Sequence, residues 1–185
     1  MMQTTRRALV AYESLFGATR RIAEAIAEGI RDSGVVAECR SVRDIPAADP
    51  GDYDLIVVGA PTHARTMPTR ESRLEGGRWQ EYRMRGRTLE ARATEPGLRE
   101  WIAEAALDGC RSAVFTTRAD LPRLLSGSAG RPIERQLRKR GAVVTDSALE
   151  ALVDDHSLLL PGQTDRARAW GALLVGTWRG VGSRG

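Results

Sequence analysis

The chain has 185 residues, a hydrophobic fraction of 42% and a formal net charge of +4. This length suits one domain with a sizeable core, and because no apolar stretch approaches ~18 residues, a membrane span is excluded. The N-terminal region lacks the apolar segment and cleavage site of a signal peptide, so a cytoplasmic location is expected. Basic residues are not interleaved with aromatic ones, which argues against nucleic-acid binding.

Strands and helices alternate along the chain, beginning with an apolar strand at residues 6–12 and an amphipathic helix at 19–33. Further strands are predicted at 35–42, 53–59 and 111–117 and within 142–153, and further helices at 97–107, 131–140 and 163–179. This alternation predicts one α/β domain over residues 1–185, with a five-stranded parallel sheet in the order 2-1-3-4-5 and helices on both faces. Ligands of such sheets bind outside the carboxyl ends of the strands, between strands one and three.

The loop between the first strand and the first helix has the composition of an anion site. Ser14 and Thr19 place hydroxyl groups at its two ends, and Gly17 allows the close backbone approach that a phosphate requires. The first N–H groups of a helix have no partners within it and carry the positive end of its dipole. The loop is therefore predicted to bind a phosphate group, with an ordinary helix cap at Ser14 or Thr19 as the alternative.

The spacing of Ser14, Gly17 and Thr19 resembles the phosphate loop of the flavodoxin family, which reads Ser/Thr-x-Thr-Gly-x-Thr. The resemblance implies a flavodoxin-like three-layer sandwich with FMN as its cofactor. It places the FMN phosphate in the loop formed by Ser14, Leu15, Phe16, Gly17, Ala18 and Thr19. Phe16 and Ala18 depart from the family's pattern, in which Thr and a polar residue are usual at these positions.

Two further loops carry the resemblance. Gly59-Ala60-Pro61-Thr62-His63 resembles a loop of one branch of flavodoxin-like proteins, which implies that Pro61, Thr62 and His63 contact the flavin. After the fourth strand, the resemblance implies cofactor contacts for Thr116, Thr117, Arg118 and Asp120. Arg118 is expected either to lie near the flavin ring or to form a salt bridge with Asp120.

Residues 60–96 interrupt the alternation, because they contain no clear strand or long helix. A segment of this length without secondary structure is usually functional or disordered. It leaves the carboxyl end of the third strand, so it either folds over the ligand site as a lid or remains a solvated insertion. The loop after the fourth strand, at residues 116–122, contains no aromatic residue. Stacking on a flavin would therefore come from Trp79 or Tyr82 in residues 60–96, from a partner subunit or from substrate.

The resemblance implies an FMN-dependent redox protein that transfers electrons or reduces a small acceptor such as a quinone. The sequence leaves open whether it is an electron carrier or an enzyme. Its electron donor would be a protein such as a reductase, and the basic net charge favours an acidic one. The alternative is a flavodoxin-fold binding module that has lost FMN and binds another anion or a protein partner. No metal site is expected, because Asp154, Asp155 and His156 form no larger group of ligands.

Overall fold

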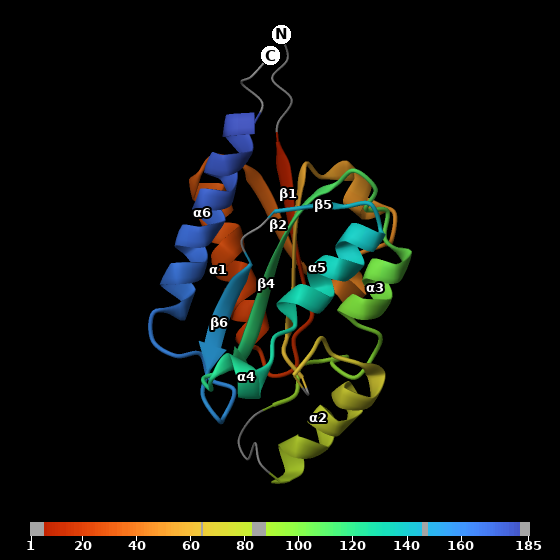
Figure 1. The fold of residues 1–185 in the computed structure, drawn as a ribbon, viewed down its shortest axis with the longest axis vertical. Coiled ribbons are helices and arrows are strands. Elements are labelled where there is room, and N and C mark those ends of the chain that lie inside the picture. The colour runs from red at the N-terminus through yellow and green to blue at the C-terminus, as the bar shows by residue number, and fades with distance from the viewer. Residues whose placement is uncertain (1–5, 64, 83–87, 146–147, 182–185) are drawn as a thin grey trace.

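A six-stranded parallel sheet forms the middle of the molecule (Figure 1). The structure is a computed structural model that describes residues 6–63, 65–82, 88–145 and 148–181, and their side chains except those of 79–82 and 178–181. The strands are β1 (Arg7–Tyr12), β2 (Val36–Ser41), β3 (Leu55–Pro61), β4 (Arg111–Ala119), β5 (Val143–Val144) and β6 (Leu149–Val153). Their order is β2-β1-β3-β4-β5, with β6 also paired to β4, which confirms the predicted α/β sheet order.

Helices cover both faces of the sheet, as predicted. In Figure 1, α1 (Ala18–Asp32) and α6 (Gln163–Val181) lie on one side of the strands, while α3 (Leu98–Glu104) and α5 (Gly130–Lys139) lie on the other. Successive residues of a strand point to opposite faces, so one strand serves both layers. In β1, Val10 packs in the core under α1 and α6, whereas Leu9 packs in the core under α3 and α5. The result is a three-layer sandwich.

The expected fifth strand is divided in two, which adds one strand to the predicted five. β5 pairs with Arg111 and Ser112 at the start of β4, while β6 pairs with the stretch from Phe115 to Ala119 at its end. The sequence between the two strands includes Asp146 and Ser147, residue types that are unfavourable in strands or favour turns. The other predicted elements agree with the structure to within three residues at either end.

The expectation that residues 60–96 contain no long helix is wrong. Within this segment, α2 (Arg70–Tyr82) forms a helix of 13 residues at the lower end of the molecule in Figure 1. Its N-terminus is stabilised by reciprocal bonds, because Thr69 N–H donates to Ser72 Oγ at 2.9 Å and Ser72 N–H donates to Thr69 Oγ1 at 3.2 Å. Gly76 and Gly77 in its middle weaken its intrinsic helix propensity, so tertiary contacts must stabilise it.

None of the helices in the described ranges has the length and apolar character that crossing a lipid bilayer would require.

Candidate functional site

The predicted anion loop lies where β1 meets α1, at the carboxyl edge of the sheet. Gly17 occupies the N-cap position of α1 with φ +92°, a left-handed conformation that glycine adopts without steric cost. Ser14 stabilises the turn, since its Oγ accepts a hydrogen bond from the Gly17 N–H at 3.1 Å. Within the described residues, no side chain caps the helix and no acidic residue lies in its first turn. The N–H groups at the start of α1 are therefore available to an anion.

Thr19 and Thr117 meet across the end of the sheet. Their hydroxyl oxygens are 2.8 Å apart, and both side chains are buried. Thr116 is also buried, but it lies on the opposite face of β4, where its Cγ2 is 3.9 Å from the position that a Cβ on Gly130 would take. Thr117 thus belongs with the anion loop, whereas Thr116 belongs with the packing of α5.

A cavity of about 210 Å³ opens beside the loop and brings together most of the predicted site residues. The predicted residues that line it are Leu15, Phe16, Ala18, Thr19, Pro61, Thr62, His63, Thr117 and Arg118. Ala119, Val153, Asp154, Asp155 and Ser157 complete the lining and were not among the predicted site residues. Ser14, Gly17, Thr116 and Asp120 do not line this cavity, and Asp120 lies exposed just beyond the end of β4.

His63 forms part of a tight turn on the wall of this cavity. Its backbone N–H donates to Thr66 O at 2.8 Å, and the Thr66 N–H donates back to His63 O at 2.9 Å. Burial, together with a smaller effect of the nearby Arg73, lowers the pKa of the His63 imidazole to about 4. The imidazole is therefore neutral near pH 7, and His63 adds no charge to the cavity that it lines.

Arg118 does not form the salt bridge with Asp120 that was one of two expectations. Its Nε lies 3.1 Å from Glu150 Oε2, and its Nη1 donates to Leu121 O at 2.9 Å. The same carboxylate accepts from Ser128 Oγ at 2.6 Å, and these contacts lower the pKa of Glu150. The guanidinium on the cavity wall is thus paired with Glu150, which also contacts Arg123 at 2.8 Å.

A buried ion pair that the sequence analysis missed lies directly behind the loop. Glu13 follows β1, and its side chain is 0% exposed, while that of Arg73 in α2 is 1% exposed. Arg73 Nη1 lies 3.4 Å from Glu13 Oε1, and Arg73 Nη2 lies 2.8 Å from Glu100 Oε1. Glu13 also accepts from the Leu98 N–H at 2.8 Å, although burial still raises the pKa of its carboxyl. The two residues are 60 positions apart, so no local pattern indicates their pairing.

The segment after α2 also attaches to the loop. The Glu90 N–H donates to Leu15 O at 2.7 Å, and Arg20 Nε lies 2.6 Å from Glu90 Oε1. In α2, a Cβ on Gly76 would lie 2.7 Å from Leu15 Cδ2, so a residue without a side chain suits this close contact. The described residues of 60–96 therefore pack against the candidate site through several contacts rather than remaining fully solvated. The side chains of Trp79 and Tyr82, the suggested stacking residues, lie outside the described part of the structure.

Asp154, Asp155 and His156 form a turn after β6. Asp154 Oδ1 accepts from the backbone N–H groups of His156 and Leu158, at 2.9 and 2.8 Å. Across the described ranges, no group of three or more His, Cys, Asp or Glu side chains is placed to hold a metal ion. The turn therefore contributes two carboxylates to the rim of the cavity.

Comparison of the sequence with a family model and of the fold with solved structures shows similarity to flavodoxins. A family model described as a flavodoxin domain matches residues 9–72, which include most of β1, the anion loop, α1, β2, β3 and the start of α2. No curated protein matches the chain.

Solved structures match over almost the whole length. A flavodoxin from the domain Archaea has a TM-score of 0.63 and 22% sequence identity, covering 92% of this chain and 97% of its own. Oxidised flavodoxin 1 from Bacillus cereus has a TM-score of 0.64 and 21% identity, with coverage of 92% and 97%. A flavodoxin, WrbA-like protein from Agrobacterium tumefaciens has a TM-score of 0.53 and 18% identity, with coverage of 94% and 98%. At these identities the matches establish the fold.

Proposed function

Because this chain is flavodoxin-like in its fold and, over residues 9–72, in its sequence, we propose that it binds FMN and acts as a redox protein. The observation that carries the proposal is the loop that opens α1. A left-handed Gly17 there leads into a helix whose first N–H groups have no side-chain cap within the described residues. This arrangement binds anions such as phosphate through backbone N–H groups and the helix dipole.

The residues around the loop fit FMN. The N–H groups of Ala18 and Thr19 would hold its phosphate. The hydroxyls of Thr19 and Thr117 bond each other at 2.8 Å, so one of the two would supply a further donor. Pro61, Thr62 and His63 extend the cavity away from the loop and would contact the rest of the cofactor. When bound, FMN supplies the electron-transfer chemistry, and the protein supplies its binding and surroundings.

The cavity size predicts that bound FMN stays partly exposed. About 210 Å³ is below the ~300–1,000 Å³ typical of pockets that enclose a small ligand. A flavin edge outside the cavity would be accessible to an electron donor or to a small acceptor such as a quinone. The net charge of +4 favours an acidic donor, such as a reductase.

Equilibrium binding of FMN and of riboflavin to the purified protein tests the proposal. We expect absorbance bands near ~375 and ~450 nm to remain with the protein after removal of excess FMN. FMN should bind at least about tenfold more tightly than riboflavin, because only FMN carries the phosphate that the loop contacts. Failure to take up either flavin would contradict the proposal and would favour a binding module for another anion or a protein.

A pair of threonine variants assigns the binding to the loop. Thr19→Val should reduce the preference for FMN over riboflavin by about tenfold, because one donor to the phosphate is lost. Thr177→Val is the matched control, since Thr177 lies exposed on α6 and donates only to Leu174 O at 3.0 Å. An unchanged preference in Thr19→Val would show that the phosphate binds elsewhere.

A further inference from the structure

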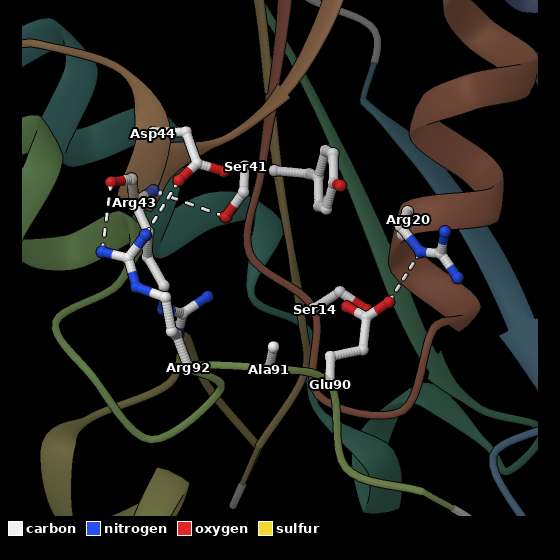
Figure 2. Close-up of a pocket in the computed structure, with 9 residues that line it drawn as sticks. Ser14, Arg20, Ser41, Arg43, Asp44, Glu90, Ala91 and Arg92 are labelled. Atoms are coloured by element: carbon white, nitrogen blue, oxygen red, sulfur yellow. Dashed lines mark hydrogen bonds and ion pairs between the residues drawn. The ribbon is translucent and has the colours of Figure 1, made fainter.

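A second cavity lies on the other side of the anion loop, between the carboxyl ends of β1 and β2 (Figure 2). Its volume is about 300 Å³, and it shares no lining residue with the first cavity. Its lining consists of Tyr12, Ser14, Arg20, Ser41, Arg43, Asp44, Glu90, Ala91 and Arg92. Arg43 and Asp44 belong to the 3-10 turn η1 (Val42–Asp44), which directly follows β2.

The charges on this lining do not cancel. Arg20 pairs with Glu90 at 2.6 Å, and Arg92 pairs with Asp44 at 2.8 Å. Figure 2 shows these two ion pairs on opposite sides of the cavity. Both carboxylates are therefore already engaged by arginines, and Arg43 is the remaining cation of the lining.

Arg43 is incompletely satisfied although it is buried. Its side chain is 5% exposed, and its nearest carboxylate, Glu13, is 3.9 Å away and already lies 3.4 Å from Arg73. Its Nη2 donates to Ala93 O at 2.9 Å, but its Nε has no partner among the described residues. Buried donors are almost always hydrogen-bonded, so an unpaired N–H of a buried guanidinium points to a missing acceptor.

Two serine hydroxyls complete a donor set beside Arg43. Ser14 Oγ accepts from the Gly17 N–H, and Ser41 Oγ accepts from the Arg43 N–H at 3.4 Å. As each hydroxyl also has a hydrogen to donate, both can bond an oxyanion together with the guanidinium. In dinucleotide-binding sheets of the Rossmann type, an arginine near the phosphate-binding loop accommodates the ribose 2′-phosphate. Arg43 has a similar place, because it follows β2 and lines the same cavity as Ser14 of the anion loop.

We propose that this second cavity binds the phosphate monoester of a nucleoside, with Arg43, Ser14 and Ser41 as its donors. The site lies outside the cavity assigned to FMN and does not depend on that assignment. A nucleotide bound here would lie against the same loop from the side of β2.

Calorimetric titration of the full chain with adenosine 2′-monophosphate, inorganic phosphate and adenosine tests the proposal. Adenosine 2′-monophosphate should bind at least about tenfold more tightly than either fragment, because it offers both the phosphate and the nucleoside. The titration is made without FMN and again with saturating FMN, and the affinity should be the same. Equal affinity for inorganic phosphate, no binding at millimolar nucleotide, or displacement by FMN would each overturn the proposal. If the protein does not bind FMN, the titration made without FMN still tests this proposal.

Variants assign the binding to the cavity. Arg43→Gln should weaken nucleotide binding by about tenfold or more, whereas Arg21→Gln, at an exposed position on α1, should leave it unchanged. If Arg43→Gln fails to fold, Ser41→Ala tests the same site and should weaken nucleotide binding to a smaller extent. Amide NMR shifts of the wild-type protein during titration should be largest at Ser14, Ser41 and Arg43. Shifts confined to other regions would place the ligand elsewhere and refute the site.

Discussion

The imidazole of His63 links the candidate FMN cavity to the stability of the fold. Burial lowers its folded-state pKa to about 4, whereas an unfolded histidine has a pKa of about 6.5. Between these two pH values the unfolded chain binds more protons than the folded one, so stability rises with pH. The contribution of His63 is complete above about pH 6.5 and is lost as the pH falls through about 4.

We therefore predict that the free energy of unfolding contains a pH-dependent part due to His63, on the order of 2–3 kcal/mol between pH 7 and 4. Urea denaturation at several pH values measures it. His63→Gln should remove this part of the slope. His156→Gln is the control, because His156 is the other histidine of the chain and is exposed, and it should retain the slope. Equal slopes in the two variants would contradict the prediction.

At the scale of elements, one buried arginine links α2 to the rest of the fold. Arg73 reaches from α2 to Glu13 behind the anion loop and to Glu100 in α3, so a single side chain joins three parts of the chain. Removing one partner of a buried ion pair leaves an uncompensated charge, which typically costs about 3–5 kcal/mol. Since Leu98 N–H and Arg43 also contact Glu13, the cost here should lie at the lower end of this range.

Arg73→Leu is thus predicted to lower the free energy of unfolding by about 3 kcal/mol, as measured by urea denaturation. Arg78→Leu, an exposed position of the same helix, should change it by less than about 0.5 kcal/mol. Adding Glu13→Gln to Arg73→Leu should restore part of the loss, because the carboxylate left behind is then neutral. Additive effects of the two substitutions would show that the pair is not energetically coupled.

At the scale of the whole molecule, α6 packs against α1, so a late helix of the chain covers an early one (Figure 1). Glycines allow this close packing. A Cβ on Gly171 would lie 2.3 Å from Ile26 O, and one on Gly29 would lie 1.9 Å from Arg168 O. The obstructing atoms belong to the backbone, so a larger residue can be accommodated only if the helices move apart.

Gly171→Ala should accordingly destabilise the protein by about 1–3 kcal/mol, measured as a lower midpoint of thermal or urea unfolding. Gly176→Ala in the same helix is a demanding control, because nothing lies within 4 Å of its added Cβ. Alanine there should stabilise the helix by about 0.5–1 kcal/mol, since glycine loses more backbone entropy on folding. Effects of the same sign in both variants would argue against the close helix contact.

The sequence by itself determined the sheet order and most helices, and it predicted the anion loop. These features are encoded locally: alternating or continuous apolar residues indicate strands, a repeated apolar face indicates α1, and Ser14, Gly17 and Thr19 show their chemistry by spacing alone. Such patterns depend on neighbours within a few positions, so they are visible without the fold.

Only the tertiary structure decided how residues 60–96 are placed and which side chains face each cavity. The helix α2 carries two glycines and no apolar face that would predict it, and its stabilising partner Glu13 is 60 positions from Arg73. The second cavity likewise joins the ends of β1 and β2 with the distant Glu90 and Arg92. Burial and ion pairing between such distant residues arise only when the chain has folded, because the sequence records neither their distances nor their exposure to water.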